Sequence, residues 1–204
     1  VQVTTGTQLA NINFTLSRLP TMEHLTFNLD NALLQDLVIR QAIALGTNRQ
    51  SMLNDAFLPY GQFGLVSNSI VPPEHWATVP ASELTLYPYD PAQANAILEA
   101  AGWINLDADV FRENASGTEL AFTFKTTPAL TRVASAEIFR QNMEQIGIRI
   151  TVEHIQPSAL FDPGGVLDRG NFDIAEFAWG NSFDDDMYLG AYTTGNISNS
   201  SGDS

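Results

Sequence analysis

The sequence predicts an α/β fold in which helices cover a mixed β-sheet, and three observations carry this prediction. Four short segments alternate apolar and polar residues, as strands do. They are residues 24–29, 120–124, 148–155 and 172–178. Three longer segments between them carry apolar residues at helical spacing: 34–45, 91–101 and 132–146. Residues 120–178 run strand, helix, strand, short helix, strand, which indicates a mixed sheet flanked by helices.

The first half of the chain contains clear stop and start signals. Residues 1–20 are polar with scattered apolar positions and predict at most one irregular strand. Gly46 is a suitable end for the helix at 34–45, and a second short helix is expected at 49–57. The segment 59–89 is rich in Pro, Gly, Ser and aromatic residues, so we expect an ordered loop lying on the core. Asp90 and Pro91 then provide an N-cap and a first helical residue, and Gly102 ends that helix.

The second half of the chain contains similar signals for the ends of helices. Gly147 follows the helix at 132–146, and a short helical turn is expected within 157–167, where Pro163-Gly-Gly165 interrupts it. The end of the chain, 193–204, is a Ser/Asn/Gly-rich stretch that predicts a flexible tail.

Composition narrows the functional classes. The net charge of −14, from 23 acidic and 9 basic residues, disfavours nucleic acid and anionic membranes as partners. The absence of cysteine excludes disulfides, thiolate metal sites and cysteine nucleophiles. A hydrophobic content of 44% in a chain of 204 residues is typical of a globular protein with a proper core.

No catalytic or metal-binding motif stands out. The nucleophile elbow, the Walker loop and the dinucleotide glycine pattern are all missing from the sequence. His24, His75 and His154 lack metal-ligand spacing, so we interpret them as packing or surface residues. The run Asp184-Asp-Asp186 has no calcium-loop spacing and is expected to be solvated. We therefore expect no enzyme activity, no metal and no cofactor.

The strand at 172–178 leads directly into a candidate ligand site. It ends at Trp179 and continues into a polar turn with Asn181, Ser182 and Phe183. An aromatic residue at the end of a strand, followed by polar loop residues, is how many α/β ligand sites are assembled. The alternative is a core Trp followed by a solvated acidic turn. Asn28, on the first strand, is a weaker ligand-binding candidate.

Four local patterns, taken in chain order, resemble one family. They are DLVIRQAIALGTNR at 36–49, IVPPEHW at 70–76, YPYDP to LEAAGW within 87–103, and GNFDIAEFAW at 170–179. Together they resemble the family 5 extracellular solute-binding proteins, the peptide- and nickel-class receptors of ABC importers.

The resemblance implies a two-lobed, periplasmic-binding-protein-like fold in which hinge motion closes the lobes over a small solute. It covers only the second lobe, which we place at 24–192, after a segment at 1–23 that leads in near the hinge. Peptide-binding members carry an aspartate for the ligand's ammonium where this chain has Ser182. A serine offers no charge, so a sugar-like solute is an alternative to a peptide.

The function implied is that of the substrate-binding component of an ABC importer, with permease subunits as partners and an extracytoplasmic location, periplasmic or lipoprotein. The alternative is a binding fold retained as an interaction or structural module without solute. The absence of the first lobe and the serine at position 182 both favour that alternative.

Overall fold

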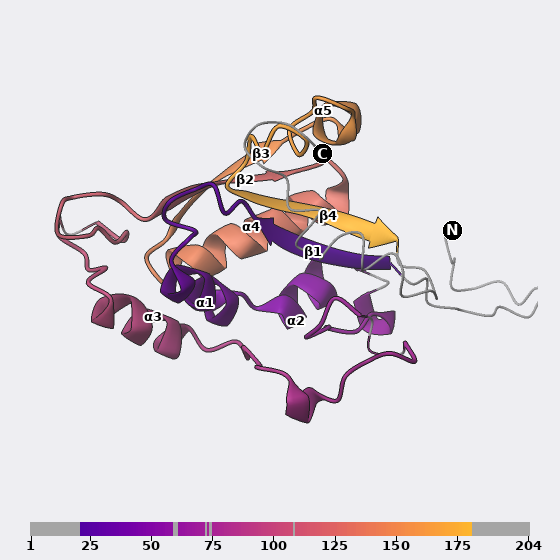
Figure 1. Ribbon diagram of the computed structural model, residues 1–204, viewed down its shortest axis with the longest axis horizontal. Helices are drawn as coiled ribbons and strands as arrows, with labels where there is room; N and C mark the ends of the chain where they lie inside the picture. Colours follow the sequence, from indigo (N-terminus) through magenta and orange to yellow (C-terminus); the bar gives the residue numbers. More distant parts are fainter. Residues whose placement is uncertain (1–20, 59–60, 72, 74, 108, 181–204) are drawn as a thin grey trace, which may run out of the picture.

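A four-stranded mixed sheet organises the computed structural model, which describes residues 21–180 except 59, 60, 72, 74 and 108 (Figure 1). The strands are β1 (Thr21–Phe27), β2 (Ala121–Thr126), β3 (Arg149–His154) and β4 (Ile174–Gly180), in the order β1-β4-β2-β3. β2 runs parallel to both β3 and β4, whereas β1 runs antiparallel to β4. The predicted mixed sheet with flanking helices is therefore confirmed.

One face of the sheet is covered by α4 (Leu130–Glu144), which connects β2 to β3 (Figure 1). The rings of Phe124 on β2 and Phe139 on α4 lie 4.8 Å apart between centroids, and neither side chain is exposed. Side chains from α1 (Leu37–Gly46), α3 (Pro91–Ala100) and α4 complete this core around the sheet. Its fully buried large members are Leu34, Ile39, Ile43, Leu98, Leu120, Phe124, Phe139, Met143, Ile146, Ile148 and Ile174.

The two ten-residue helices both begin at side-chain caps. In α1 (Leu37–Gly46) the Asp36 carboxylate accepts the N–H of Val38, and in α3 (Pro91–Ala100) Asp90 accepts the N–H of Gln93. These bonds satisfy N–H groups that have no partner inside the helix. The predicted start of α3 is confirmed. α1 starts three residues later than predicted, because Leu34 packs into the core from a turn that precedes the cap.

The segment after α1 departs from expectation. Instead of one short helix at 49–57, a brief α2 (Arg49–Ser51) continues into a π-helical turn, η1 (Met52–Ala56). The following connection includes the 3-10 turns η2 (Gly61–Phe63) and η3 (Ala81–Glu83) and runs along the outside of α1 and α2 (Figure 1).

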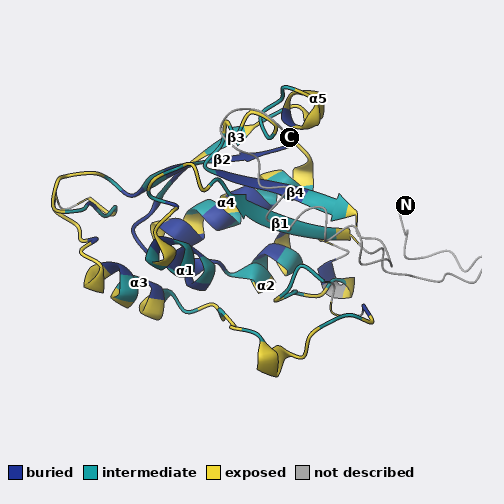
Figure 2. Cartoon of the chain, viewed as in Figure 1, coloured by how far each residue is buried: buried dark blue, intermediate teal, exposed yellow. Residues whose placement is uncertain are grey.

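This connection is tied to the fold by polar bonds as well as by packing. The Arg49 guanidinium donates to the carbonyl oxygens of Ser67 and Tyr87, at 2.8 and 3.1 Å. Several of its apolar side chains nevertheless face solvent, and Trp76 is 76% exposed. The expected ordered loop is present, but Figure 2 shows that much of it is exposed rather than laid against the core.

Arg112 fastens the C-terminal ends of α3 and α4 to the irregular segment between α3 and β2. Its guanidinium donates to the carbonyl oxygens of Ile146 and Trp103, at 3.0 and 2.8 Å. It also pairs with Glu99 on α3 at 3.0 Å. Gly147 lies directly against this side chain with φ +74°, and an added Cβ would come within 2.5 Å of Arg112 Cγ. Glycine is therefore required there for both conformation and space.

The opposite face of the sheet carries the short helix α5 (Pro157–Phe161) and the loop that returns from it to β4. Among the helices of the described ranges, none has the length and apolar character that crossing a bilayer requires.

Candidate functional site

Successive residues of β4 point to opposite faces of the sheet, and one contact identifies the residues that face α4. The hydroxyl of Ser135 on α4 donates to Glu176 Oε1 at 2.5 Å, so Glu176 faces α4. Because side chains alternate along a strand, Phe177 and Trp179 are placed on or toward the other face.

That face carries an aromatic cluster, consisting of His24, Phe161, Phe177 and Trp179. The ring of His24 on β1 lies 4.4 Å from that of Phe177 and 5.9 Å from that of Trp179, both edge to face. Phe161, at the end of α5, meets Phe177 at 5.9 Å. Phe177 is buried, Trp179 is half-buried and Phe161 is 46% exposed. Phe177, at the centre of the cluster, is thus covered, whereas the rings of Trp179 and Phe161 are partly exposed.

His24 enters this cluster as a neutral ring. Burial lowers the pKa of His24 below its ordinary value, because desolvation disfavours the imidazolium. Its Nδ1 is buried and makes no hydrogen bond within the described ranges. The sequence predicted that His24 is a packing or surface residue, and its ring contacts are those of a packing residue.

The predicted ligand residues fall into two groups. Trp179 is the second-to-last residue of β4 and pairs with Met22 of β1. Its partial burial fits a ring that can still meet a ligand. Asn181, Ser182 and Phe183, predicted to share the site, lie outside the described residues.

The structure does not bring Asn28 to Trp179. Asn28 follows Phe27, the β1 residue that pairs with the first residue of β4, so it lies at the opposite end of the strand pair. Its amide nitrogen donates to the carbonyl oxygens of Gly170 and Phe172, at 2.8 and 2.9 Å, and its oxygen accepts the N–H of Asp30. The amide nitrogen therefore holds the loop that leads into β4, and the amide oxygen holds the turn that follows β1.

We expect Asn28→Ala to lower the free energy of unfolding by about 1–3 kcal/mol, because it leaves two partly buried carbonyls without their donor. Urea denaturation of the variant measures the loss. Asn28→Asp keeps the size and the acceptor but removes the donor, so it should lose a comparable amount. Unchanged stability in both variants would contradict this role.

A buried carboxylate lies on the α4 face, three residues before Trp179. Glu176 is 2% exposed, and its Oε2 has no hydrogen-bond partner within the described part of the chain. Burial raises the pKa of Glu176 to about 7. Nearby, Arg132 of α4 pairs with Glu23 of β1 at 2.8 Å. The sequence does not single out Glu176, since its polar side chain is only one break in an apolar strand.

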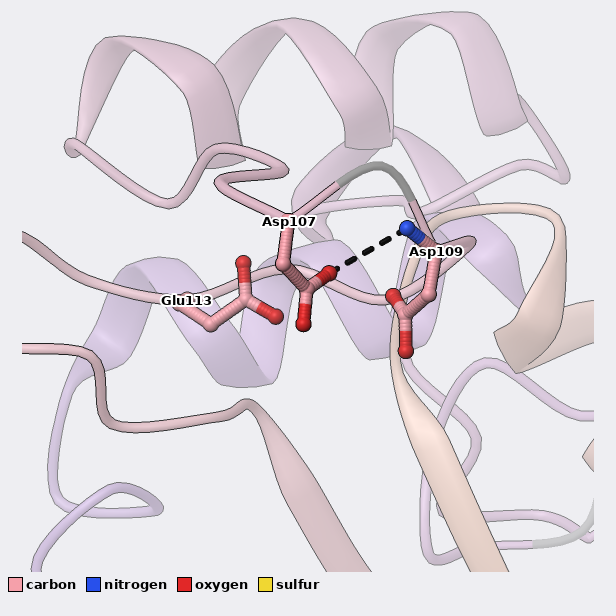
Figure 3. Close-up of side chains that lie close together, drawn as sticks. All are labelled: Asp107, Asp109 and Glu113. Atoms are coloured by element: carbon pink, nitrogen blue, oxygen red, sulfur yellow. Dashed lines mark hydrogen bonds between the residues drawn. The ribbon is translucent and has the colours of Figure 1, made fainter.

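Three carboxylates approach one another between α3 and β2: Asp107, Asp109 and Glu113 (Figure 3). Their oxygens lie within 4.8 Å of one another, the single such group among the described residues. Internal contacts offset much of this charge. Asp109 pairs with Arg149 at 3.2 Å, and Glu113 accepts the N–H of Leu106. The arrangement is that of an acidic turn stabilised by its own donors.

One protein family and several known proteins match this chain. Residues 2–200 match the family described as bacterial extracellular solute-binding proteins, family 5 middle. The nickel-binding periplasmic protein of Escherichia coli K12 is 28% identical over 169 residues, which cover 81% of this chain and 30% of that protein. The oligopeptide-binding protein AppA of Bacillus subtilis is 24% identical over 166 residues, with the same two coverages. The chain thus spans about 30% of the length of these relatives.

Solved structures agree with the fold. AppA of Bacillus subtilis, in complex with a nonapeptide, superposes with a TM-score of 0.71 over 81% of this chain and 32% of its own, at 22% identity. NikZ of Campylobacter jejuni, in complex with Ni(L-His), gives a TM-score of 0.69 over 85% and 32%, at 26% identity. The family match over residues 2–200 includes all the strands and helices of the described fold, so this chain belongs to the family 5 bacterial extracellular solute-binding proteins.

Proposed function

We propose that the protein containing this chain is the substrate-binding component of an ABC importer, which takes up a peptide-like or other small solute. The observation that carries this proposal is the family match over residues 2–200. The relatives named above are a nickel-binding periplasmic protein and an oligopeptide-binding protein. We therefore place the protein outside the cytoplasm, with membrane permease subunits as its partners and no catalytic step of its own.

This chain would form one lobe, residues 24–192, of a solute cleft. Among the described residues, the half-buried ring of Trp179 at the end of β4 would contact the solute. The ring of His24 packs against it edge to face. A flat aromatic surface held by its neighbours offers area for stacking against a solute. Asn181, Ser182 and Phe183 would supply the polar contacts that orient it.

A peptide-like solute suits this lobe better than a directly ligated nickel ion. Nickel favours imidazole nitrogen ligands, and the three histidines of the chain are separated in the sequence and do not form a metal-binding group among the described residues. A nickel ion carried inside a small chelate would bind as a small solute and needs no such ligands.

Thermal-shift measurements on the whole protein test the proposal. We expect one of three ligand classes to raise the melting temperature: di- to pentapeptides, oligosaccharides or nickel–histidine chelates. A ligand that binds only the native state stabilises it by mass action. Stabilisation by none of these classes, together with turnover of some substrate, would refute the proposal.

Trp179→Ala tests the ring directly. In the whole protein we expect the affinity for the stabilising solute to fall by about 1–3 kcal/mol, because an anchoring aromatic contact is lost. The ring is not fully enclosed, so the stability of the fold should change little. Calorimetric titration and urea denaturation measure the two quantities. A loss of about 3–5 kcal/mol in stability with unchanged affinity would instead identify a core Trp.

A further inference from the structure

The buried carboxyl group of Glu176 uses only one of its two oxygens. Its Oε1 accepts the Ser135 hydroxyl at 2.5 Å, and its Oε2 has no partner among the described residues. A neutral carboxyl group can remain in such a place, because it carries no charge. An ionised one needs a cation beside it, since a buried charge without a partner is costly.

One cation lies close to this carboxyl group. The charged groups that act on Glu176 are Arg132 of α4 and Glu23 of β1. β2 contributes only the Thr126 hydroxyl, which donates to the backbone carbonyl of Glu176 at 3.0 Å. Arg132 is therefore the cation that an ionised Glu176 can reach within the described part of the chain.

Two other basic side chains of the strands point away from Glu176. Phe124 of β2 packs on α4, so the adjacent Lys125 faces the opposite side of the sheet, where it pairs with Glu153 at 3.3 Å. The His24 ring likewise lies on that side, against Phe177. Neither can replace Arg132 beside Glu176.

Arg132 connects α4 to β1. Its Nε and Nη2 donate to the two carboxylate oxygens of Glu23, at 2.9 and 3.3 Å, and its Nη1 donates to the Thr127 hydroxyl at 2.8 Å. Between β1 and α4, this ion pair is the single polar contact that the described residues make. Glu23 pairs with Ala178 in the strand register, one residue before Trp179. The contact therefore holds the end of the strand pair that carries the Trp179 ring.

Exposure decides which carboxylate keeps the guanidinium once both are ionised. A guanidinium pairs its parallel N–H donors with one carboxylate at a time. The side chain of Glu23 is 27% exposed, so water can solvate it after release. Glu176 is almost fully buried and has no such replacement. Arg132 is therefore more stable beside Glu176 than beside Glu23 when both carry a charge.

We propose that Arg132 changes partner when Glu176 loses its proton. While Glu176 is neutral, Arg132 holds Glu23 of β1; when the proton has left to solvent, Arg132 turns to Glu176 of β4 and releases Glu23 to water. Because burial raises the pKa of Glu176 to about 7, the exchange takes place between pH 5 and pH 8. It loosens β1 from α4 at the higher pH, and it does not depend on the proposed function.

The effect of Glu23→Gln on the urea midpoint of the whole protein, measured at pH 5 and at pH 8, tests the exchange. We expect the substitution to lower the midpoint at pH 5, because Arg132 loses its partner. At pH 8 it should leave the midpoint unchanged or raise it, because Arg132 has already moved and a like charge is removed from beside Glu176. An equal loss at the two pH values would overturn the proposal.

Glu176→Gln identifies the group that loses the proton. In this background Arg132 has no ionised competitor for Glu23, so Glu23→Gln should lower the midpoint equally at pH 5 and pH 8. A pH dependence that persists in this background would also overturn the proposal. Arg132→Gln completes a double-mutant cycle with Glu23→Gln, whose non-additive part should fall at least about twofold from pH 5 to pH 8. The Glu23→Gln comparison stands without that cycle if Arg132→Gln fails to fold.

Glu137→Gln is the matched control on the same helix. Glu137 pairs with Arg140 at 2.8 Å on the exposed side of α4, and this contact lowers the pKa of Glu137 to about 2. Both groups are thus charged at pH 5 and at pH 8, so the effect of Glu137→Gln on the midpoint should be the same at both. A change with pH as large as that for Glu23→Gln would show a general response of ion pairs on α4 and would refute the exchange.

Discussion

Phe139→Ala is expected to lower the free energy of unfolding by about 3–5 kcal/mol, the largest effect that we predict for a single substitution in this fold. Phe139 is fully buried on α4, and its ring packs on that of Phe124 at 4.8 Å. Truncation removes the apolar area and leaves a cavity between helix and sheet that the rigid strand cannot close.

Urea denaturation followed by circular dichroism measures this loss. Leu130→Ala is the matched control, because Leu130 belongs to the same helix but is 87% exposed. It should change stability by no more than about 0.5 kcal/mol. A similar, small effect of both substitutions would show that α4 does not pack on the sheet as described.

Glu176 is expected to make the stability of the protein fall as the pH rises from about 4.5 to about 7. Burial raises the pKa of this carboxyl to about 7 in the folded state, from 4.5. A proton is therefore bound more tightly in the folded protein than in the unfolded chain. The stabilisation is fully present below the unfolded pKa and is lost as the pH rises through the folded one. A shift of this size corresponds to about 3 kcal/mol.

The comparison of wild type with Glu176→Gln isolates this effect. Ser135, Thr126, Arg132 and Glu23 surround the carboxyl in both proteins. The lowered pKa of His24 acts in the opposite sense, since its folded form resists protonation as the pH falls below 6.5. That contribution is common to both proteins and cancels in the difference. Between pH 5 and pH 8, the urea midpoint of the wild type should therefore fall relative to that of the variant. Equal changes in the two proteins would contradict the prediction.

The parts of the fold that the sequence predicted well are those governed by local signals. The Asp90 cap, the Pro91 start and the glycines at 102 and 147 depend on neighbours a few residues away, and each is found where expected. Lengths of strands were less predictable. β1 begins at Thr21 and ends at Phe27, rather than 24–29, because its extent is set by pairing with β4, which is remote in sequence.

The same division applies to the candidate sites. Trp179 could be proposed from a strand pattern followed by a polar turn. Glu176 could not be recognised as a buried acid, because its partner Ser135 lies 41 residues away on α4.

The pairing of β1 with β4 also sets the order in which the chain can assemble. Thr21 pairs with Gly180, so the first described strand must wait for the last one to be synthesised. At about 5–20 residues per second, that wait is roughly 8–30 s. The unit β2-α4-β3 needs only nearby segments and can form while β1 is still without its neighbour. Throughout that interval the β1 segment has no strand to pair with, so its backbone hydrogen-bonding groups and the side chains of Leu25 and Phe27 stay open to contact with chaperones and other nascent chains.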